Sequence, residues 1–192
     1  KQFQNHGDKL IIVTRSSGNR TVPYDRFAYG NLLNKQTLFL LENLDEQIKK
    51  KTILRLHNNY TEGLYEELDN FFKKNTVITI NQNTNYFKLI KQSKLVIFND
   101  ISSGFLHNLT INVPSICYLP IGLSFIHDEN KADYLKLINH QLMFDDISKL
   151  TTFINSGWKD LNRWWNNPQL NQVRNEFCLK YSIHPPKNAI EK

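Results

Sequence analysis

Two serines and a glycine follow a short hydrophobic run in the middle of the chain. After the run Leu95–Phe98, the sequence continues as Asn99-Asp100-Ile101-Ser102-Ser103-Gly104. Serine hydroxyls and the backbone amides of a helix N-terminus both donate hydrogen bonds to anions, so this segment is suited to binding a phosphate. Serine is also a favoured N-cap residue in any helix, so plain capping is the alternative interpretation.

Basic side chains follow two other hydrophobic runs. Arg55 and His57 are two residues apart at the end of the run 52–57, and strand alternation puts both on one side and Leu56 on the other. Arginine can hold a phosphate through two hydrogen bonds, and histidine can donate a hydrogen bond or carry a proton. The alternative is a pair that meets a neighbouring acid. Arg15, next to a Ser-Ser-Gly turn, is a third candidate for binding an anion.

Several well-known signatures of catalysis and cofactor binding are absent from the sequence. It contains no G-x-G-x-x-G, G-x-x-x-x-G-K-[ST], H-E-x-x-H or G-x-S-x-G pattern, and no histidines or cysteines at metal-ligand spacing. We therefore expect no bound cofactor and no metal site. Cys117 and Cys178 stand alone in apolar surroundings, which predicts two free thiols rather than a disulfide framework.

The elements that must position these residues alternate regularly. Hydrophobic, β-rich runs at 10–14, 52–57, 76–80, 94–98 and 114–119, with a shorter one at 141–144, are separated by segments of helical periodicity. This alternation predicts the α/β class: a Rossmann-like parallel sheet with helices on both faces. We expect residues 1–157 to form this domain and residues 158–192 to form a C-terminal helical tail. Aromatic side chains of the tail, Trp158, Trp164 and Trp165, should pack back on the domain.

In an open parallel sheet, ligands bind outside the carboxyl ends of the strands, near the point where the strand order reverses. That rule selects the residues that follow each predicted strand. They are Arg15 after the first strand, His57 after the second and Asn81 after the third, together with the serines and glycine of 102–104.

Lys and Arg number 24 against 18 Asp and Glu, a net charge of +6. The excess is compatible with nucleotide sugars, nucleic acid or an acidic membrane surface as partners. The basic residues are spread along the sequence, with the densest cluster at Lys49–Lys51, which argues against a nucleic-acid-binding protein. There is no apolar run long enough for a transmembrane helix and no signal peptide. We therefore expect a cytoplasmic protein, with peripheral association at the inner face of the membrane as a further expectation.

The segment from Ser93 to Ile116 resembles a known pattern. It is similar to the signature S-x-L-V-I … [ST]-T-x-x-L-E-x-L-x-x-N-x-P of the donor-binding halves of GT-B glycosyltransferases. Trp164-Trp165, followed by Arg174, Phe177 and Tyr181, resembles the W-W … R-x-x-F … Y tail of transferases for lipopolysaccharide or surface-carbohydrate synthesis. Arg55-Leu56-His57 falls where some of these enzymes carry an Arg or His-Pro motif. The resemblance covers residues 8–182, and Asn58 replaces the proline of that motif.

This resemblance implies the C-terminal half of a GT-B architecture, which transfers a sugar from a nucleotide-sugar donor to a glycan acceptor. An N-terminal domain, absent from a chain that begins at Lys1, would bind the acceptor. In such a domain we expect Arg15, Arg55 and His57 to supply charge to the donor phosphates and Ser102, Ser103 and Gly104 to supply hydroxyl and backbone donors, without an obligatory metal. His107 stands where the family carries a glutamate that holds the donor ribose, and His107 and Asn81 are the candidates for ribose or base. No catalytic base is identified.

Two other classes fit the same residues. One is a non-catalytic nucleotide- or glycan-binding α/β module. The other is a related double-Rossmann enzyme, such as an epimerase or a glycerophosphotransferase.

Overall fold

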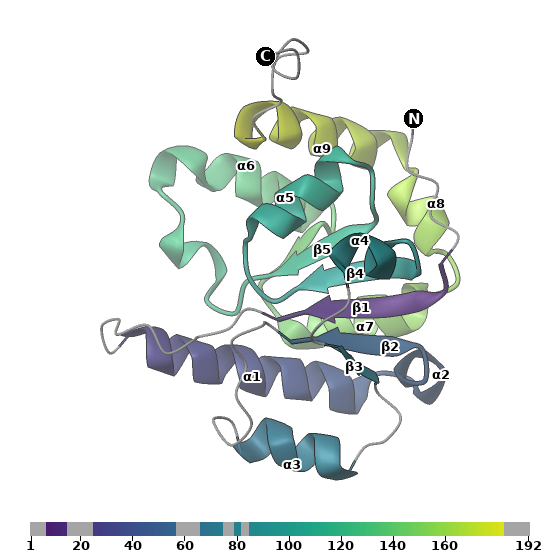
Figure 1. Ribbon diagram of the computed structural model, residues 1–192. Coiled ribbons are helices and arrows are strands. Elements are labelled where there is room, and N and C mark those ends of the chain that lie inside the picture. Colours follow the sequence, from purple (N-terminus) through teal and green to yellow (C-terminus); the bar gives the residue numbers. More distant parts are fainter. Residues whose placement is uncertain (1–6, 15–24, 57–65, 75–78, 82–84, 183–192) are drawn as a thin grey trace, which may run out of the picture.

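The computed structural model describes residues 7–14, 25–56, 66–74, 79–81 and 85–182 (Figure 1). The runs of buried strand and amphipathic helix follow one another as the sequence predicts. Within the described ranges, no helix is both long enough and apolar enough to cross a membrane.

Six parallel strands form one sheet in the order β3-β2-β1-β4-β5-β6. This order reverses between β1 and β4, as in the two-halved Rossmann sheet. Leu10 lies opposite Thr52 of β2 and opposite Leu95 of β4, so β1 is the central strand. The predicted fold class is confirmed. The strands are β1 (Lys9–Val13), β2 (Thr52–Arg55), β3 (Thr79–Asn81), β4 (Ser93–Phe98), β5 (Ser115–Tyr118) and β6 (Met143–Phe144).

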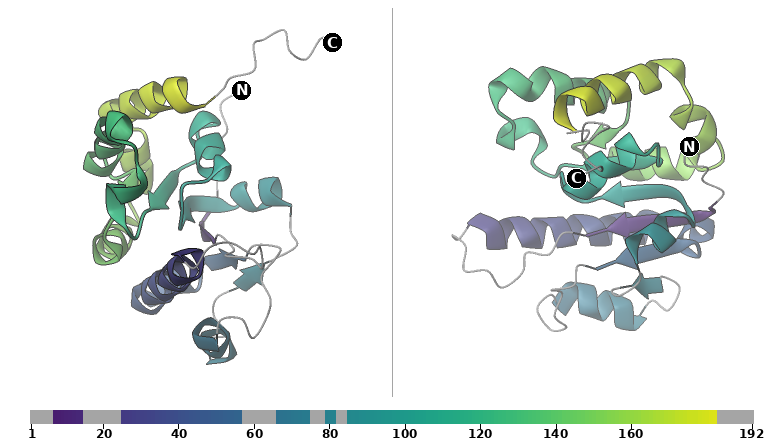
Figure 2. Two further views of the ribbon diagram at one scale, coloured as in Figure 1. Left: turned by 90° about the vertical axis from the view of Figure 1, so that its left-hand side faces the viewer. Right: turned by 45° about the horizontal axis from the view of Figure 1, so that its top comes forward.

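Helices connect the strands and cover both faces of the sheet (Figures 1 and 2). The helices are α1 (Asp25–Asn43), α2 (Glu46–Lys49), α3 (Glu66–Lys74), α4 (Tyr86–Ile90), α5 (Ser103–Thr110), the 3-10 helix η1 (Gly122–Phe125), α6 (Asp128–Asn139), α7 (Ile147–Gly157), α8 (Leu161–Trp165) and α9 (Pro168–Tyr181). The side chain of Asn85 caps α4 and accepts a hydrogen bond from the amide of Phe87 at 2.8 Å.

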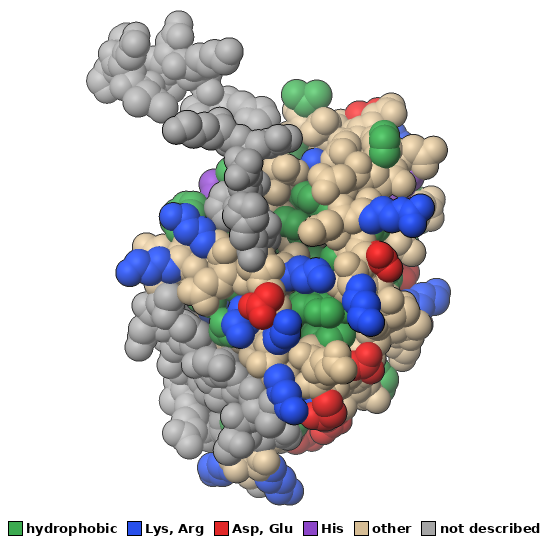
Figure 3. Space-filling view, turned by 90° about the vertical axis from the view of Figure 1, so that its right-hand side faces the viewer, with side chains coloured by type: hydrophobic (Ala, Val, Ile, Leu, Met, Phe, Trp, Pro, Cys, Tyr) green, Lys and Arg blue, Asp and Glu red, His purple; other side chains and the backbone are tan. Residues whose placement is uncertain are grey.

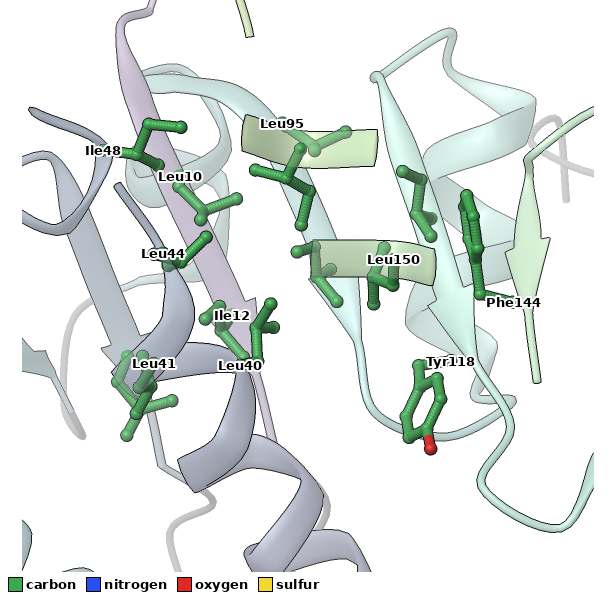
Figure 4. Packing of buried hydrophobic residues seen from close by; sticks show 14 of the residues in the cluster. Leu10, Ile12, Leu40, Leu41, Leu44, Ile48, Leu95, Tyr118, Phe144 and Leu150 are labelled. Atoms are coloured by element: carbon green, nitrogen blue, oxygen red, sulfur yellow. The ribbon is translucent and has the colours of Figure 1, made fainter. Parts of the chain in front are cut away.

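Strand alternation divides the core into two layers. Leu10 and Ile12 point to the face covered by α1 and α7, where they meet Leu41 and Leu150 (Figure 4). Ile11 points to the opposite face, which is covered by α4, α5, α6 and α9. Because β1 and β4 are buried on both faces, their sequences are continuous apolar runs rather than alternating ones.

The segment after α7 packs on the sheet domain. Trp165 is 3% exposed, and its indole N–H donates to Oδ1 of Asn112 at 3.0 Å. Arg174 of α9 lies over the same ring, 4.1 Å from its centroid. Asn112 has a φ of 64°, so the indole bond stabilises a left-handed turn just before β5. The boundary proposed at residue 157 stays a prediction.

Candidate functional site

The reversal of strand order places β1 and β4 side by side, and polar residues follow the carboxyl ends of both. The amide and the hydroxyl of Thr14 both donate to the carbonyl of Arg55, at 3.0 and 3.2 Å. The amide of Asn99 donates to the carbonyl of Val13 at 3.3 Å. The ends of β2, β1 and β4 are therefore held in fixed positions relative to one another.

Asn99 and Asp100 are buried at this edge, although the sequence argument passed over them in favour of the serines. Asn99 is 4% exposed, and its amide nitrogen lies 3.4 Å from the hydroxyl of Thr37 on α1. Asp100 is 9% exposed, and its carboxylate accepts the amide of Ile101 at 2.8 Å. Buried polar groups at a strand end are retained where they organise a neighbouring loop or site, and the burial of Asn99 and Asp100 could not be seen in the sequence.

The predicted serines lie at the start of α5, and the two serines differ in role. Ser102 is the N-cap residue: its hydroxyl accepts the amide of Phe105 at 3.3 Å, so its oxygen is engaged in capping. Ser103 is exposed. The backbone amides of Ser103 and Gly104 donate no hydrogen bond to another described residue. Amides at a helix N-terminus carry partial positive charge, so these two can bind an anion.

Gly104 lies close to the end of β4. A Cβ atom at this position would be 3.0 Å from the Phe98 ring, tighter than ordinary packing. Glycine therefore allows α5 to begin directly against the aromatic side chain of the strand.

Arg55 ends β2, and its guanidinium lies over the ring of Tyr86, 5.1 Å from the centroid. No carboxylate in the described part of the chain pairs with Arg55, so the expected alternative of a neighbouring acid is not seen there. An aromatic face attracts the cation without using its N–H groups. The planar donors of Arg55 therefore stay suited to a ligand.

Tyr86 is itself anchored in a short polar chain. Its hydroxyl donates to Oδ1 of Asn108 at 2.8 Å, and the amide nitrogen of Asn108 donates to the hydroxyl of Ser115 at 2.9 Å. Asn108 and Ser115 are fully buried. Burial raises the pKa of Tyr86 well above its usual value, against the opposing effects of the Asn108 hydrogen bond and the Arg55 charge, so the hydroxyl remains a donor. The sequence argument did not identify Tyr86.

His107 lies on the solvent side of α5, beside Phe87 of α4. The two rings meet edge to face with centroids 5.9 Å apart, and Phe87 is 54% exposed. Because Tyr86 and Phe87 are consecutive, the contacts of α4 link the end of β2 to α5. An exposed aromatic ring beside an imidazole is suited to contact a flat or hydroxylated ligand group.

The structure locates only some of the predicted residues. Arg15 and His57 lie outside the described residues. Asn81 ends β3 and pairs with Arg55 across the sheet, but its side chain is not described. Arg55 and the start of α5 lie at the carboxyl edge of the sheet. His107 lies further along α5, on the side next to α4. Within the described ranges, no three His, Cys, Asp or Glu side chains gather in a way that could hold a metal ion.

A hollow of about 650 Å³ lies elsewhere, beside the edge strand β6. Its lining includes Met143 and Phe144 from the strand and Phe153 from α7, with Gln141 and Lys149 at its rim. None of the predicted site residues lines it.

Comparison with known proteins identifies a family and a similar fold. A family model described as LIC12162 family transferase matches residues 10–191. Among solved structures, WaaG, a glycosyltransferase involved in lipopolysaccharide biosynthesis, matches with a TM-score of 0.50 at 10% sequence identity. The match covers 92% of this chain and 48% of WaaG, so the chain spans about half the length of that structure. No curated protein matches by sequence. The likeness to WaaG shows a shared fold.

Proposed function

Because the chain belongs to the LIC12162 family of transferases, we propose that it is the donor-binding half of a glycosyltransferase that uses a nucleotide sugar. The acceptor in this proposal is a glycan of a bacterial surface polysaccharide or lipopolysaccharide, bound by a second domain. WaaG, the GT-B glycosyltransferase whose fold the chain shares, acts in lipopolysaccharide biosynthesis and supports this choice of chemistry.

The single observation that carries the proposal is the cation at the end of β2. Arg55 is held over Tyr86 at the carboxyl edge, where its N–H groups can bind two oxygens of a diphosphate. The unpaired amides of Ser103 and Gly104 add donors at the positive end of α5. Arg15 and His57 complete the proposed phosphate site, and His107 and Asn81 are assigned to the ribose or base.

In this mechanism the chain stabilises the leaving nucleotide rather than attacking the sugar. Negative charge builds on the leaving phosphate as the bond to the sugar breaks. Side-chain cations and helix amides that are already oriented lower the energy of that charge without an obligatory metal. The protein would work at the cytoplasmic surface of the membrane, where both substrates are available.

Calorimetric titration of UDP-, GDP-, CMP- and CDP-linked sugars into the chain tests the proposal. We expect one base to bind and Arg55→Ala to weaken that binding about ten- to a hundred-fold, since a charge-assisted hydrogen bond contributes about 1.5–3 kcal/mol. Ser103→Ala should have a smaller effect because the backbone amides remain.

The control is Lys50→Ala, an exposed residue at the end of α2, which should leave the affinity unchanged. Equal affinity for the wild type and Arg55→Ala would remove the phosphate role. Tight donor binding with no transfer by the complete protein would instead indicate a non-catalytic binding module.

A further inference from the structure

Lysines that are far apart in the sequence gather at the opposite edge of the sheet, where the strands begin. Lys9 opens β1 and Lys51 directly precedes β2; the register places these two side by side. Lys94, the second residue of β4, lies on the other side of β1. Lys50 and Lys91, at the ends of α2 and α4, are exposed just before β2 and β4.

The turn between α7 and α8 brings further groups to this edge. Trp158 follows α7, and the ammonium of Lys94 lies 5.1 Å from the centroid of its indole ring. Lys159 and Arg163 follow in the chain, and both are exposed. We call this set the amino-edge surface: Lys9, Lys50, Lys51, Lys91, Lys94, Trp158, Lys159 and Arg163. Figure 3 looks onto this edge and shows Lys and Arg side chains around apolar surface.

Acidic side chains lie among these cations, with Asp45, Glu46 and Asp160 exposed near the ends of α1, α2 and α7. Asp8 pairs with Lys51 at 3.2 Å and more loosely with Lys9 at 3.8 Å. Burial and the positive charge of Lys51 lower the pKa of Lys94, although the negative charge of Asp160 acts in the opposite direction. Lys51 therefore repels the ammonium of Lys94. Lys50 and Lys91 form no ion pair with a described carboxylate. Several cations of this surface, among them Lys50 and Lys91, are therefore left without a described acidic partner.

The proposed donor site does not account for these cations. It lies at the carboxyl ends of the same strands, on the opposite side of the sheet. A basic surface that includes a partly exposed indole matches the chemistry of a bilayer interface, where lysines reach anionic headgroups and tryptophan sits at headgroup depth.

Asp8 helps to distinguish the two polyanions that could bind. A nucleic-acid backbone has fixed phosphate spacing, so a carboxylate between Lys9 and Lys51 would face a phosphate. Lipids move laterally, and their headgroups can collect under the lysines and leave the carboxylate alone. The arrangement therefore favours lipid over nucleic acid.

We propose that the amino-edge surface binds the anionic headgroups of a lipid bilayer and orients the carboxyl edge away from the membrane. Each lysine near a negatively charged membrane surface strengthens binding about five-fold, and salt screens this contribution. Binding is therefore reversible and strongest at low ionic strength. Vesicle binding requires neither donor nor acceptor, so its failure would leave the proposed transferase function untouched.

Co-sedimentation of the chain with phosphatidylcholine vesicles, with and without one-quarter phosphatidylglycerol, tests the proposal. We expect binding only to the anionic vesicles, and Lys50→Glu/Lys91→Glu should weaken it by at least about thirty-fold. Both lysines are exposed and neither pairs with a carboxylate of the described residues, so the fold should be unaffected. Trp158→Phe should weaken binding less and should reduce the blue shift of tryptophan fluorescence on vesicle addition.

The matched control is Lys35→Glu/Lys149→Glu, which changes the net charge equally at exposed positions on α1 and at the start of α7. It should bind anionic vesicles nearly as well as the wild type. Equal weakening by both double variants would show a response to net charge alone and overturn the proposal. Binding of a single-stranded oligonucleotide in the absence of vesicle binding would replace the lipid by nucleic acid.

Discussion

At the scale of single residues, the arginine of the candidate site depends on an aromatic partner. The position of Arg55 at a strand end was predictable because the end of a hydrophobic run marks it, whereas His57 lies outside the described residues and stays a prediction. Tyr86 was not predictable, because its role depends on residues that are distant in the sequence. It contacts Arg55 of β2 and Asn108 of α5, and Asn108 in turn is held by Ser115 of β5. A tyrosine next to a phenylalanine at the start of a helix gives no such signal.

The Tyr86 side chain has two functions: its ring holds Arg55, and its hydroxyl donates a hydrogen bond to Asn108. The variants Tyr86→Leu and Tyr86→Phe separate them. Phenylalanine keeps the ring under Arg55 but leaves the buried Asn108 oxygen without its donor. It should therefore lower the free energy of unfolding by about 1–3 kcal/mol while affinity for the donor is kept. Leucine removes the ring as well, and we expect a further three- to tenfold loss of donor affinity. Urea unfolding and calorimetry measure the two effects; equal donor affinity in both variants would contradict the positioning of Arg55 by the ring.

Cys117 predicts how stability depends on alkaline pH. Burial, reinforced by the charge of Asp100, raises the pKa of its thiol well above 9.0, so the folded state keeps the thiol protonated. The unfolded chain ionises near its ordinary pKa. Stability is therefore complete below about pH 9 and declines as the pH rises above it, by up to about 1.4 kcal/mol per pH unit for one proton.

Comparison of urea unfolding at about pH 8 and about pH 10 for the wild type and Cys117→Ala measures this contribution. The variant should be less stable at both pH values because of the cavity, but its stability should fall less between them. Burial also raises the pKa of Tyr118 to about 12, so some decline remains in the variant. Parallel decline in the two proteins would contradict the assignment to Cys117.

At the scale of elements, strands buried on both faces were the easiest to predict. β1 and β4 are continuous apolar runs, and their boundaries agree with the prediction to within one residue. β6 is only two residues long, shorter than the predicted 141–144, because Gln141 adopts a φ of 62° and turns the chain before the ladder begins. Such a turn depends on the preceding α6 and leaves little trace in the sequence.

Trp165 is one of several buried side chains by which the helical segment after α7 packs on the domain. Trp165→Ala should lower the free energy of unfolding by about 3–5 kcal/mol, because it removes a buried ring, its bond to Asn112 and the partner of Arg174. Thermal or urea unfolding measures this loss. Leu179→Ala, at a position on α9 that is 75% exposed, is the control and should change stability little. A small effect of Trp165→Ala would mean that this indole contributes little to the fold.

At the scale of the whole molecule, the sheet separates two surfaces. Its carboxyl edge carries the candidate donor site, and its amino edge collects the lysines. The sequence predicted the first surface, because strand ends can be located along the chain. It did not predict the second, since the lysines are separated by many residues and meet only through the parallel register.

The chain spans about half the length of WaaG, and we have proposed that the acceptor is bound by a second domain. We therefore expect the chain to bind the donor but not to transfer its sugar alone. Nucleotide release, measured with a coupled assay and a glycan acceptor, should stay at the background rate. Repeated turnover by the chain alone would show that acceptor binding resides within these residues.

The central position of β1 also has a consequence for synthesis on the ribosome. Among the described strands of this sheet, β1 is made first, yet one of its two neighbours, β4, begins only at Ser93. Until β4 has emerged, β1 exposes an unpaired edge and apolar side chains, the kind of surface that promotes aggregation of nascent chains. A chain that ends before Ser93 should therefore depend on chaperones, and completion of β4 should mark the point at which the emerging protein becomes resistant to proteolysis.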